Sequence, residues 1–153
     1  MVGSLNKNQT MEKRELIGST GKVFYTIEYN EERQWLYSNW IGYVNVEDVK
    51  RGCNLGAELI SKTGCPNLLN DNRQLTGPWR DANDWIAQDW MPRALQAGLK
   101  NFAHIASSNV FAEYSAKDLE TRLDELNFVL KVFKDAELAQ RWLDSQIDER
   151  ILS

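Results

Sequence analysis

The chain has 153 residues, a formal net charge of −4, 42% hydrophobic residues and 26% charged residues. This length fits one domain, and the composition is that of a globular protein. The acidic balance lacks the clustered Lys and Arg on which nucleic-acid binding relies, so we expect no nucleic-acid partner. No apolar run approaches the roughly 20 residues that span a bilayer, and the N-terminus lacks the pattern of a signal peptide. We therefore predict a cytoplasmic protein without a transmembrane segment.

Residues 1–20 are polar and show no sustained periodicity, which predicts a flexible N-terminal segment with at most one short helical turn at residues 12–16. Apolar and polar residues then alternate over residues 22–29, and β-branched and aromatic side chains dominate. A polar turn separates this stretch from a second strand over residues 34–43. The short connection predicts an antiparallel hairpin.

A first helix is predicted to begin after Asn45, because Asn is a favoured N-cap and acidic residues follow in the first turn. Gly64 ends this helix, and the proline that follows prevents its continuation. Gly52 and Gly56 lie four residues apart and weaken the helix intrinsically. We interpret them as positions of close packing against a sheet.

The rest of the chain alternates between short apolar strands and amphipathic helices. The predicted elements are a strand at residues 67–70, a loop at residues 71–80, a helix at residues 81–97 that Pro92 kinks or divides, a strand at residues 101–107, a helix capped by Ser115, an edge strand at residues 128–133 and a helix capped by Asp135. This order predicts an α/β domain over residues 21–146, followed by a C-terminal tail at residues 147–153. Its sheet would have five mixed, mostly parallel strands: an opening antiparallel hairpin, then strands that alternate with helices.

Several stretches resemble the SpoIIAA-like group of the STAS fold: Trp40-Ile41-Gly42, Leu68-Leu69-Asn70-Asp71, the helix with Trp85 and Trp90, and the closing helix from Ala136 to Leu143. The resemblance covers roughly residues 21–143. It implies a STAS-like α/β domain that binds a partner protein through the loop after the third strand and the following helix. In that family a serine in this loop is phosphorylated by the partner kinase. The stretch from Asp71 to Trp79 departs from that pattern because it contains no serine, and Thr76 is its only hydroxyl. The group includes many proteins of unassigned function.

The segment from Asp71 to Asp81 is the most informative for function. It follows a strand and leads to a helix N-terminus, which is where open α/β sheets bind ligands and where backbone N–H groups favour anions. Ser107 and Ser108 follow the next strand and would lie nearby. The candidate binding residues are Asp71, Asn72, Arg73, Thr76, Trp79, Arg80, Ser107 and Ser108. The alternative is a structural loop in which Asp71 and Asn72 cap backbone groups, Trp79 covers the core edge and the serines provide turn chemistry.

No nucleophile elbow, dinucleotide fingerprint or P-loop occurs in the sequence. Two cysteines and one histidine, His104, are too few for a disulfide framework or a metal cluster, so we expect reduced thiols, no metal and no cofactor. His104 lies within an apolar strand, which favours a core histidine over a catalytic base. An enzyme remains an alternative only if Asp71, Arg73 and His104 converge in one cleft.

We therefore predict a non-enzymatic binding or regulatory module. Its partner would be another protein or a second copy, and the Trp-rich helix would be the natural dimer surface. The alternative is a carrier or sensor of a small apolar or lipid-like ligand, because the aromatic content would permit a hydrophobic pocket.

Overall fold

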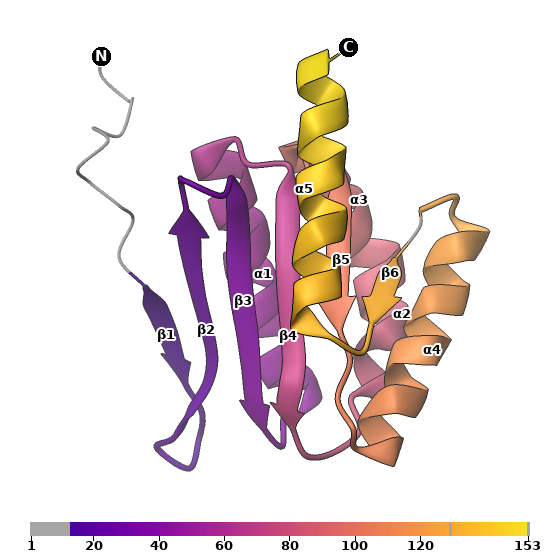
Figure 1. Ribbon diagram of the computed structural model, residues 1–153. Coiled ribbons are helices and arrows are strands. Elements are labelled where there is room, and N and C mark those ends of the chain that lie inside the picture. The colour runs from indigo at the N-terminus through magenta and orange to yellow at the C-terminus, as the bar shows by residue number, and fades with distance from the viewer. Residues whose placement is uncertain (1–12, 129, 153) are drawn as a thin grey trace.

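The computed structural model describes residues 13–128 and 130–152, which form an α/β protein around one mixed sheet. The strands lie side by side in the order in which they occur in the chain (Figure 1). They are β1 (Arg14–Ile17), β2 (Val23–Asn30), β3 (Trp35–Gly42), β4 (Asn67–Leu75), β5 (Asn101–Ile105) and β6 (Lys131–Phe133). β1, β2 and β3 pair in antiparallel fashion, whereas β3 to β6 pair in parallel. The predicted hairpin and the parallel strands after it are confirmed.

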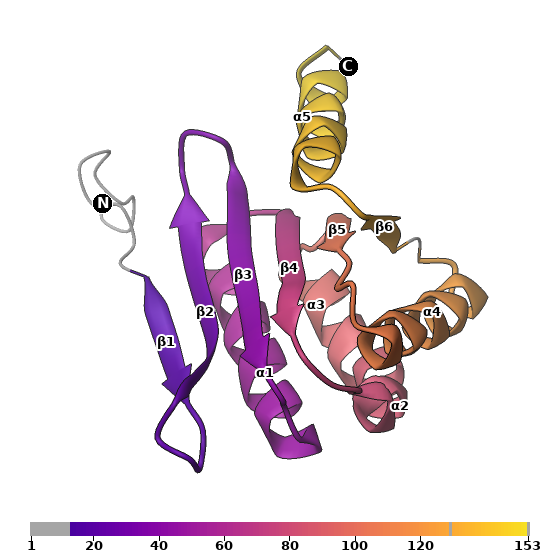
Figure 2. The ribbon, with the colours of Figure 1, turned by 60° about the horizontal axis from the view of Figure 1, so that its bottom comes forward.

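The helices cover the two faces of this sheet unequally. They are α1 (Val46–Thr63), the short α2 (Asn83–Trp85), α3 (Met91–Ala97), α4 (Val110–Glu125) and α5 (Ala136–Leu152). Figure 2 shows α1 to α4 on one face and α5 alone on the other. Between the sheet and α1 to α4 lies the larger core, whereas α5 packs Ala139 and Leu143 against Leu69 and Ile105 on the opposite face. No helix in the described part of the chain has the length and apolar content to cross a membrane.

The first helix follows its sequence signals. The Asn45 side chain accepts a hydrogen bond from the backbone of Asp48, and the Asp48 carboxylate accepts one from the backbone of Asn45. Gly64 ends the helix in the left-handed region at φ 71°, where a residue without a Cβ is least strained. A Cβ on Gly52 would lie 2.4 Å from the Trp40 ring. The predicted close packing is therefore confirmed at this glycine.

The prediction that a loop begins at Asp71 is wrong, because β4 continues to Leu75. Asp71 pairs with Asn39 of β3, and Leu75 pairs with Gly42. The sequence after Leu69 is polar, which disfavours a strand locally. Parallel pairing with β3 supplies the backbone hydrogen bonds and overrides that local preference.

At the N-terminal end, the structure has a strand where a helical turn was predicted. β1 adds a sixth strand, so the five-stranded sheet is corrected to six strands among the described residues. Arg14 pairs with Ile27, and Leu16 pairs with Tyr25. The four residues of β1 are too few for their periodicity to predict a strand. β1 forms because it pairs with the edge of β2 that would otherwise be free. Residue 12 and the first part of the predicted flexible segment lie outside the described residues.

The start of α4 also differs from the prediction. Asn109 caps this helix by accepting hydrogen bonds from the backbone of Phe111 and Ala112, so the predicted cap at Ser115 is wrong. Ser115 lies one and a half turns inside the helix, is fully buried, and donates its hydroxyl to the Phe111 carbonyl. The wrong prediction arose because Asp118, three residues after Ser115, gives the spacing of a capping box in the sequence.

Pro92 divides the second helical region as predicted. A 3₁₀ turn (Arg80–Ala82), α2 and a π turn (Ile86–Trp90) precede Pro92, and α3 begins beside it. Proline cannot donate the helical hydrogen bond, which explains the irregular turn before it. At the C-terminal end, Asp135 caps α5 as predicted, and the helix continues to Leu152 through the segment predicted as a tail.

Candidate functional site

Strand alternation separates the predicted binding residues, because β4 runs on through Asp71, Asn72 and Arg73. Asp71 and Arg73 lie on the face that carries α5, next to Tyr37 of β3. The Tyr37 hydroxyl donates to Asp71 Oδ2 at 2.6 Å. The Arg73 guanidinium donates to both carboxylate oxygens, from Nε to Oδ1 at 3.0 Å and from Nη2 to Oδ2 at 2.7 Å. Asp71 is thus buried and satisfied within its own sheet.

These contacts fix the charge state of the cluster. Burial by itself would raise the pKa of Asp71, but the hydrogen bonds from Arg73 and Tyr37 outweigh it and hold the pKa below its usual value. Burial and the adjacent carboxylate raise the pKa of Tyr37 to about 12. Asp71 and Arg73 form an ion pair to which Tyr37 donates a further hydrogen bond. These bonds occupy the carboxylate oxygens of Asp71, so it is not in position to act as a base at neutral pH.

Asn72 points to the other face of the sheet, into the larger core, with Asn70 and His104. Asn70 Nδ2 lies 3.2 Å from Asn72 Oδ1 and 3.1 Å from His104 Nδ1, and Asn72 Nδ2 lies 3.4 Å from His104 Nε2. The Ser38 hydroxyl and the Trp40 indole both donate to Asn70 Oδ1, at 2.7 and 2.8 Å. All three cluster side chains are buried. We call Asn70, Asn72 and His104 the buried polar cluster.

His104 is a core histidine, as predicted. Burial lowers the pKa of its imidazole to about 4, so the ring is neutral at physiological pH. His104 pairs with Asn70 across the sheet, whereas Asp71 pairs with Ile105. Asp71 and His104 therefore point to opposite faces, and the cleft that the enzyme alternative requires from Asp71, Arg73 and His104 does not form.

Beside the buried polar cluster, the core contains a cavity of about 50 Å³. Its polar wall consists of the cluster together with Ser38 and Tyr25. The remaining walls are apolar and come from strands, α1, α4 and the π turn, with Val49, Ile86 and Phe102 among them. A cavity of this size is too small for an acyl chain, so the lipid-like ligand finds no room here.

At the carboxyl ends of β3, β4 and β5, a second arrangement involves residues 76–80. Thr76 is exposed, and its backbone N–H donates to the Gly42 carbonyl. The Asn109 side chain donates to the Thr76 carbonyl at 3.0 Å, and the Ser107 hydroxyl donates to the Leu75 carbonyl at 3.1 Å. These bonds tie the loop after β4 to the end of β3 and to the start of α4.

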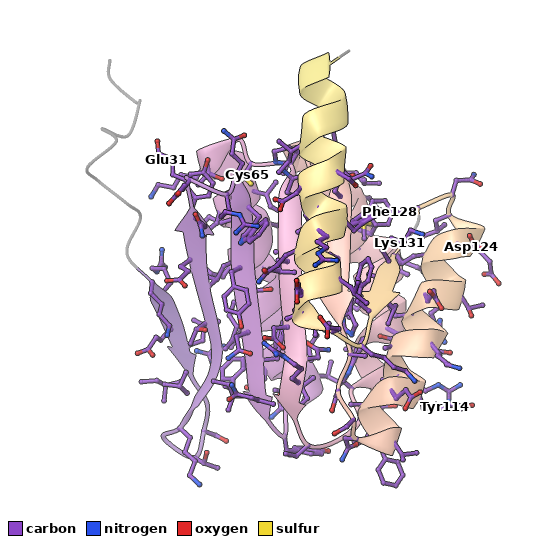
Figure 3. All side chains as sticks on the ribbon, in the orientation of Figure 1. Glu31, Cys65, Tyr114, Asp124, Phe128 and Lys131 are labelled. Carbon is purple, nitrogen blue, oxygen red and sulfur yellow. The ribbon has the colours of Figure 1, made fainter. Side chains whose placement is uncertain are left out.

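Large apolar side chains surround this loop and point to solvent. Tyr43 is 68% exposed, Val110 72%, Phe111 65% and Tyr114 61%. Figure 3 shows Tyr114 near the N-terminal end of α4, at the same end of the molecule as the carboxyl ends of the parallel strands. Tyr43 contacts Gly77 closely, since a Cβ there would lie 2.7 Å from the tyrosine ring. We call the exposed residues Tyr43, Thr76, Pro78, Arg80, Val110, Phe111 and Tyr114 the carboxyl-end surface.

Hollows flank this surface on both sides. One of about 330 Å³ lies between the β3–α1 turn and residues 78–81, and one of about 450 Å³ lies between α4 and β6. Arg80 is exposed, places its guanidinium 5.5 Å from the Tyr114 ring, and pairs with Asp118 at 3.5 Å. Ser108 is exposed and lines the larger hollow. Polar groups therefore border the exposed apolar side chains.

Trp79 is buried, and its backbone N–H donates to the Ser115 hydroxyl at 3.1 Å. The structural alternative for this residue, that it covers the edge of the core, is confirmed. Its indole Nε1 is buried and has no hydrogen-bond partner in the described part of the chain. Among the predicted binding residues, Thr76 and Arg80 are thus exposed around the loop after β4, and Ser108 lines the hollow between α4 and β6, whereas Asn72 and Trp79 line the inner cavity.

The tryptophans of the second helical region do not form the exposed patch that was predicted as a dimer surface. Trp90 is fully buried, and its indole donates to the Cys53 carbonyl. Trp85 packs against the core, and the side chains of Lys50 and Arg93 lie over its ring. Most of the exposed aromatic surface lies instead on α4.

Neither Tyr43 nor Val110 had a signal in the sequence, because packing decides whether an apolar side chain is exposed. The buried polar cluster did have a signal: the spacing of Asn70 and Asn72 places them on one face of any strand that includes both. No family model, curated protein or solved structure matches the chain.

Proposed function

We propose that this chain is a non-enzymatic, STAS-like binding module that docks another protein on its carboxyl-end surface. The observation that carries the proposal is the gathering of Tyr43, Val110, Phe111 and Tyr114, each more than 60% exposed, around one hydrogen-bonded loop. Large exposed apolar side chains gathered around one segment mark candidate interaction sites. Aromatic residues in particular are enriched at the centres of protein interfaces.

The local structure supports a preformed surface. The loop at residues 76–80 is held from both sides, by Gly42 and by Asn109. A fixed surface loses little conformational entropy on binding, which favours affinity. The polar border, with Arg80 and Asp118 paired beside Tyr114, resembles the rim of an interface.

The resemblance to the STAS fold is the reason for proposing a different protein, and not a second copy, as the partner. In that family the loop after the third strand and the following helix contact a different protein. The strand that the resemblance matches to this third strand is β4, because β1 is additional, so the corresponding loop would be residues 76–80. Within this proposal, Thr76 is the residue that a partner kinase would modify. It is exposed in the structure, which a modified hydroxyl requires.

The test uses a photoreactive phenylalanine analogue at position 111 of the full chain, with the analogue at position 138 as the control. Leu138 is 52% exposed but lies on α5, on the other face of the sheet. We expect a crosslink to one distinct protein from position 111 and none from position 138. The crosslinked protein, once purified, should bind Phe111→Glu at least about tenfold more weakly than wild type, because an interface anchor is lost. Leu138→Glu should bind like wild type.

Equal crosslinking from both positions would refute the proposal, as would unchanged binding by Phe111→Glu. A crosslinked product of twice the chain mass would show that the partner is a second copy of this chain and not a different protein. A phosphate-labelling experiment with the purified partner tests separately whether Thr76 is phosphorylated. Labelling that persists in Thr76→Ala excludes Thr76 as the phosphorylated residue.

A further inference from the structure

The buried polar cluster has more hydrogen-bond donors than acceptors. The orientation of Asn70 is fixed, because its Oδ1 accepts from Ser38 and Trp40 and its Nδ2 must therefore face Asn72 and His104. A neutral imidazole has one donor nitrogen and one acceptor nitrogen. Both amide nitrogens nevertheless lie beside the two ring nitrogens of His104.

With the imidazole in this orientation, no assignment of protons satisfies all of these groups. If His104 Nδ1 accepts from Asn70, then Nε2 carries the proton and faces another N–H donor, Asn72 Nδ2. If the Asn72 amide is turned over, its Oδ1 accepts from Nε2–H, but its Nδ2 then faces Asn70 Nδ2. Protonation of the ring would only add a donor. If Nδ1 carries the proton instead, it faces the N–H donor Asn70 Nδ2. With the ring in this orientation, at least one N–H of the cluster therefore faces another N–H instead of an acceptor.

A second donor without a partner lines the same cavity. Trp79 is 8% exposed, its Nε1 is buried and unpartnered, and its ring centroid lies 6.1 Å from that of His104. A buried donor without an acceptor is costly, because it has lost its hydrogen bonds to water without replacing them. Both donors belong to residues that line one cavity, so an acceptor bound in that cavity could satisfy them.

We propose that this cavity binds a small, uncharged molecule with a carbonyl oxygen, which accepts hydrogen bonds from the Trp79 indole and from the Asn72–His104 pair. The volume of about 50 Å³ exceeds the roughly 10–15 Å³ that one water molecule requires, so it admits a ligand of a few non-hydrogen atoms. The apolar wall with Val49, Ile86 and Phe102 would contact its hydrocarbon part.

Charge excludes the competing ligand class. Among the residues that the structure describes, neither an arginine nor a lysine lines the cavity, and burial keeps His104 neutral. A carboxylate would lose its hydration without gaining a counter-ion, which is strongly unfavourable. A ketone or a primary amide supplies the same acceptor without that cost. A cluster of water molecules would satisfy the polar wall but not the apolar one.

The test follows the indole N–H signals of ¹⁵N-labelled full-length protein during titration with acetone, and with acetate as the charged control. The spectrum of Trp79→Phe identifies the Trp79 signal by its loss. We expect acetone to shift the Trp79 signal saturably and to leave the Trp85 signal unchanged, because Trp85 does not line the cavity. Acetate should shift neither signal.

A matched pair of variants locates the site. Val49→Leu adds a methylene group at the cavity wall, whereas Val46→Leu makes the same change one turn away on α1, outside the cavity. We expect the affinity for acetone to fall about tenfold or more in Val49→Leu, since overpacking a filled space is costly, and to stay unchanged in Val46→Leu. The other indole signals report whether each variant keeps its fold.

The proposal is overturned if acetone leaves the Trp79 signal in place, or if Val49→Leu binds acetone as wild type does. It is also overturned if the Trp79 indole proton shows contacts with cavity water that acetone fails to displace, which would make the occupant water alone.

Discussion

Between pH 7 and pH 5, the free energy of unfolding should fall because His104 is buried in its neutral form. In the unfolded chain the imidazole binds a proton near its ordinary pKa of 6.5, whereas in the folded protein burial lowers the pKa to about 4. The unfolded state therefore binds more protons in this window, and stability decreases as the pH decreases. The difference between the two pKa values corresponds to about 3 kcal/mol in full, of which about 2 kcal/mol is lost by pH 5.

Urea denaturation at several pH values between 7 and 5 measures this loss, with His104→Gln as the matched control. Glutamine retains polar contacts but does not titrate, and the chain has no other histidine. We expect the wild-type curve to fall by about 2 kcal/mol and the variant curve to stay nearly flat, although the variant begins at a lower stability. Parallel curves for the two proteins would refute the assignment of a buried, neutral His104.

Three further predictions concern packing, the ion pair and a helix cap. Gly52→Ala should lower the free energy of unfolding by about 1–3 kcal/mol, because the added Cβ would lie 2.4 Å from the Trp40 ring. Gly56→Ala has room, with 3.4 Å between its Cβ and the Tyr25 hydroxyl, so it should raise the melting temperature through its higher helix propensity. Asp71→Asn should lower the pKa of Tyr37 from about 12 toward 10 in a spectrophotometric titration, and an unchanged pKa would contradict the Tyr37–Asp71 contact. Asn109→Ala should cost about 1–2 kcal/mol in chemical denaturation, and a loss below a few tenths would show that another residue caps α4.

Local signals were sufficient wherever one residue decides one backbone feature. Asn45 and Asp135 cap their helices because a short polar side chain next to free N–H groups has an immediate partner. Gly64 ends α1 because only a residue without a Cβ adopts the left-handed conformation at little cost. Pro92 interrupts a helix wherever it occurs. The hairpin of β2 and β3 follows from alternation over two adjacent stretches, which needs no distant contact.

The candidate sites depended on contacts between segments far apart in the chain. Whether residues 71–75 form a loop or a strand is decided by the free edge of β3, and that decision sends Asp71 and Asn72 to opposite faces of the sheet. Burial of His104 beside two asparagines required β4 and β5 to pair in one particular register. The exposure of Phe111 was equally hidden, because an apolar side chain on a helix is buried or solvated only according to what packs against that face. The amino-acid sequence determined the local elements, and tertiary pairing decided which polar groups meet, since strand register and helix packing are properties of the whole chain.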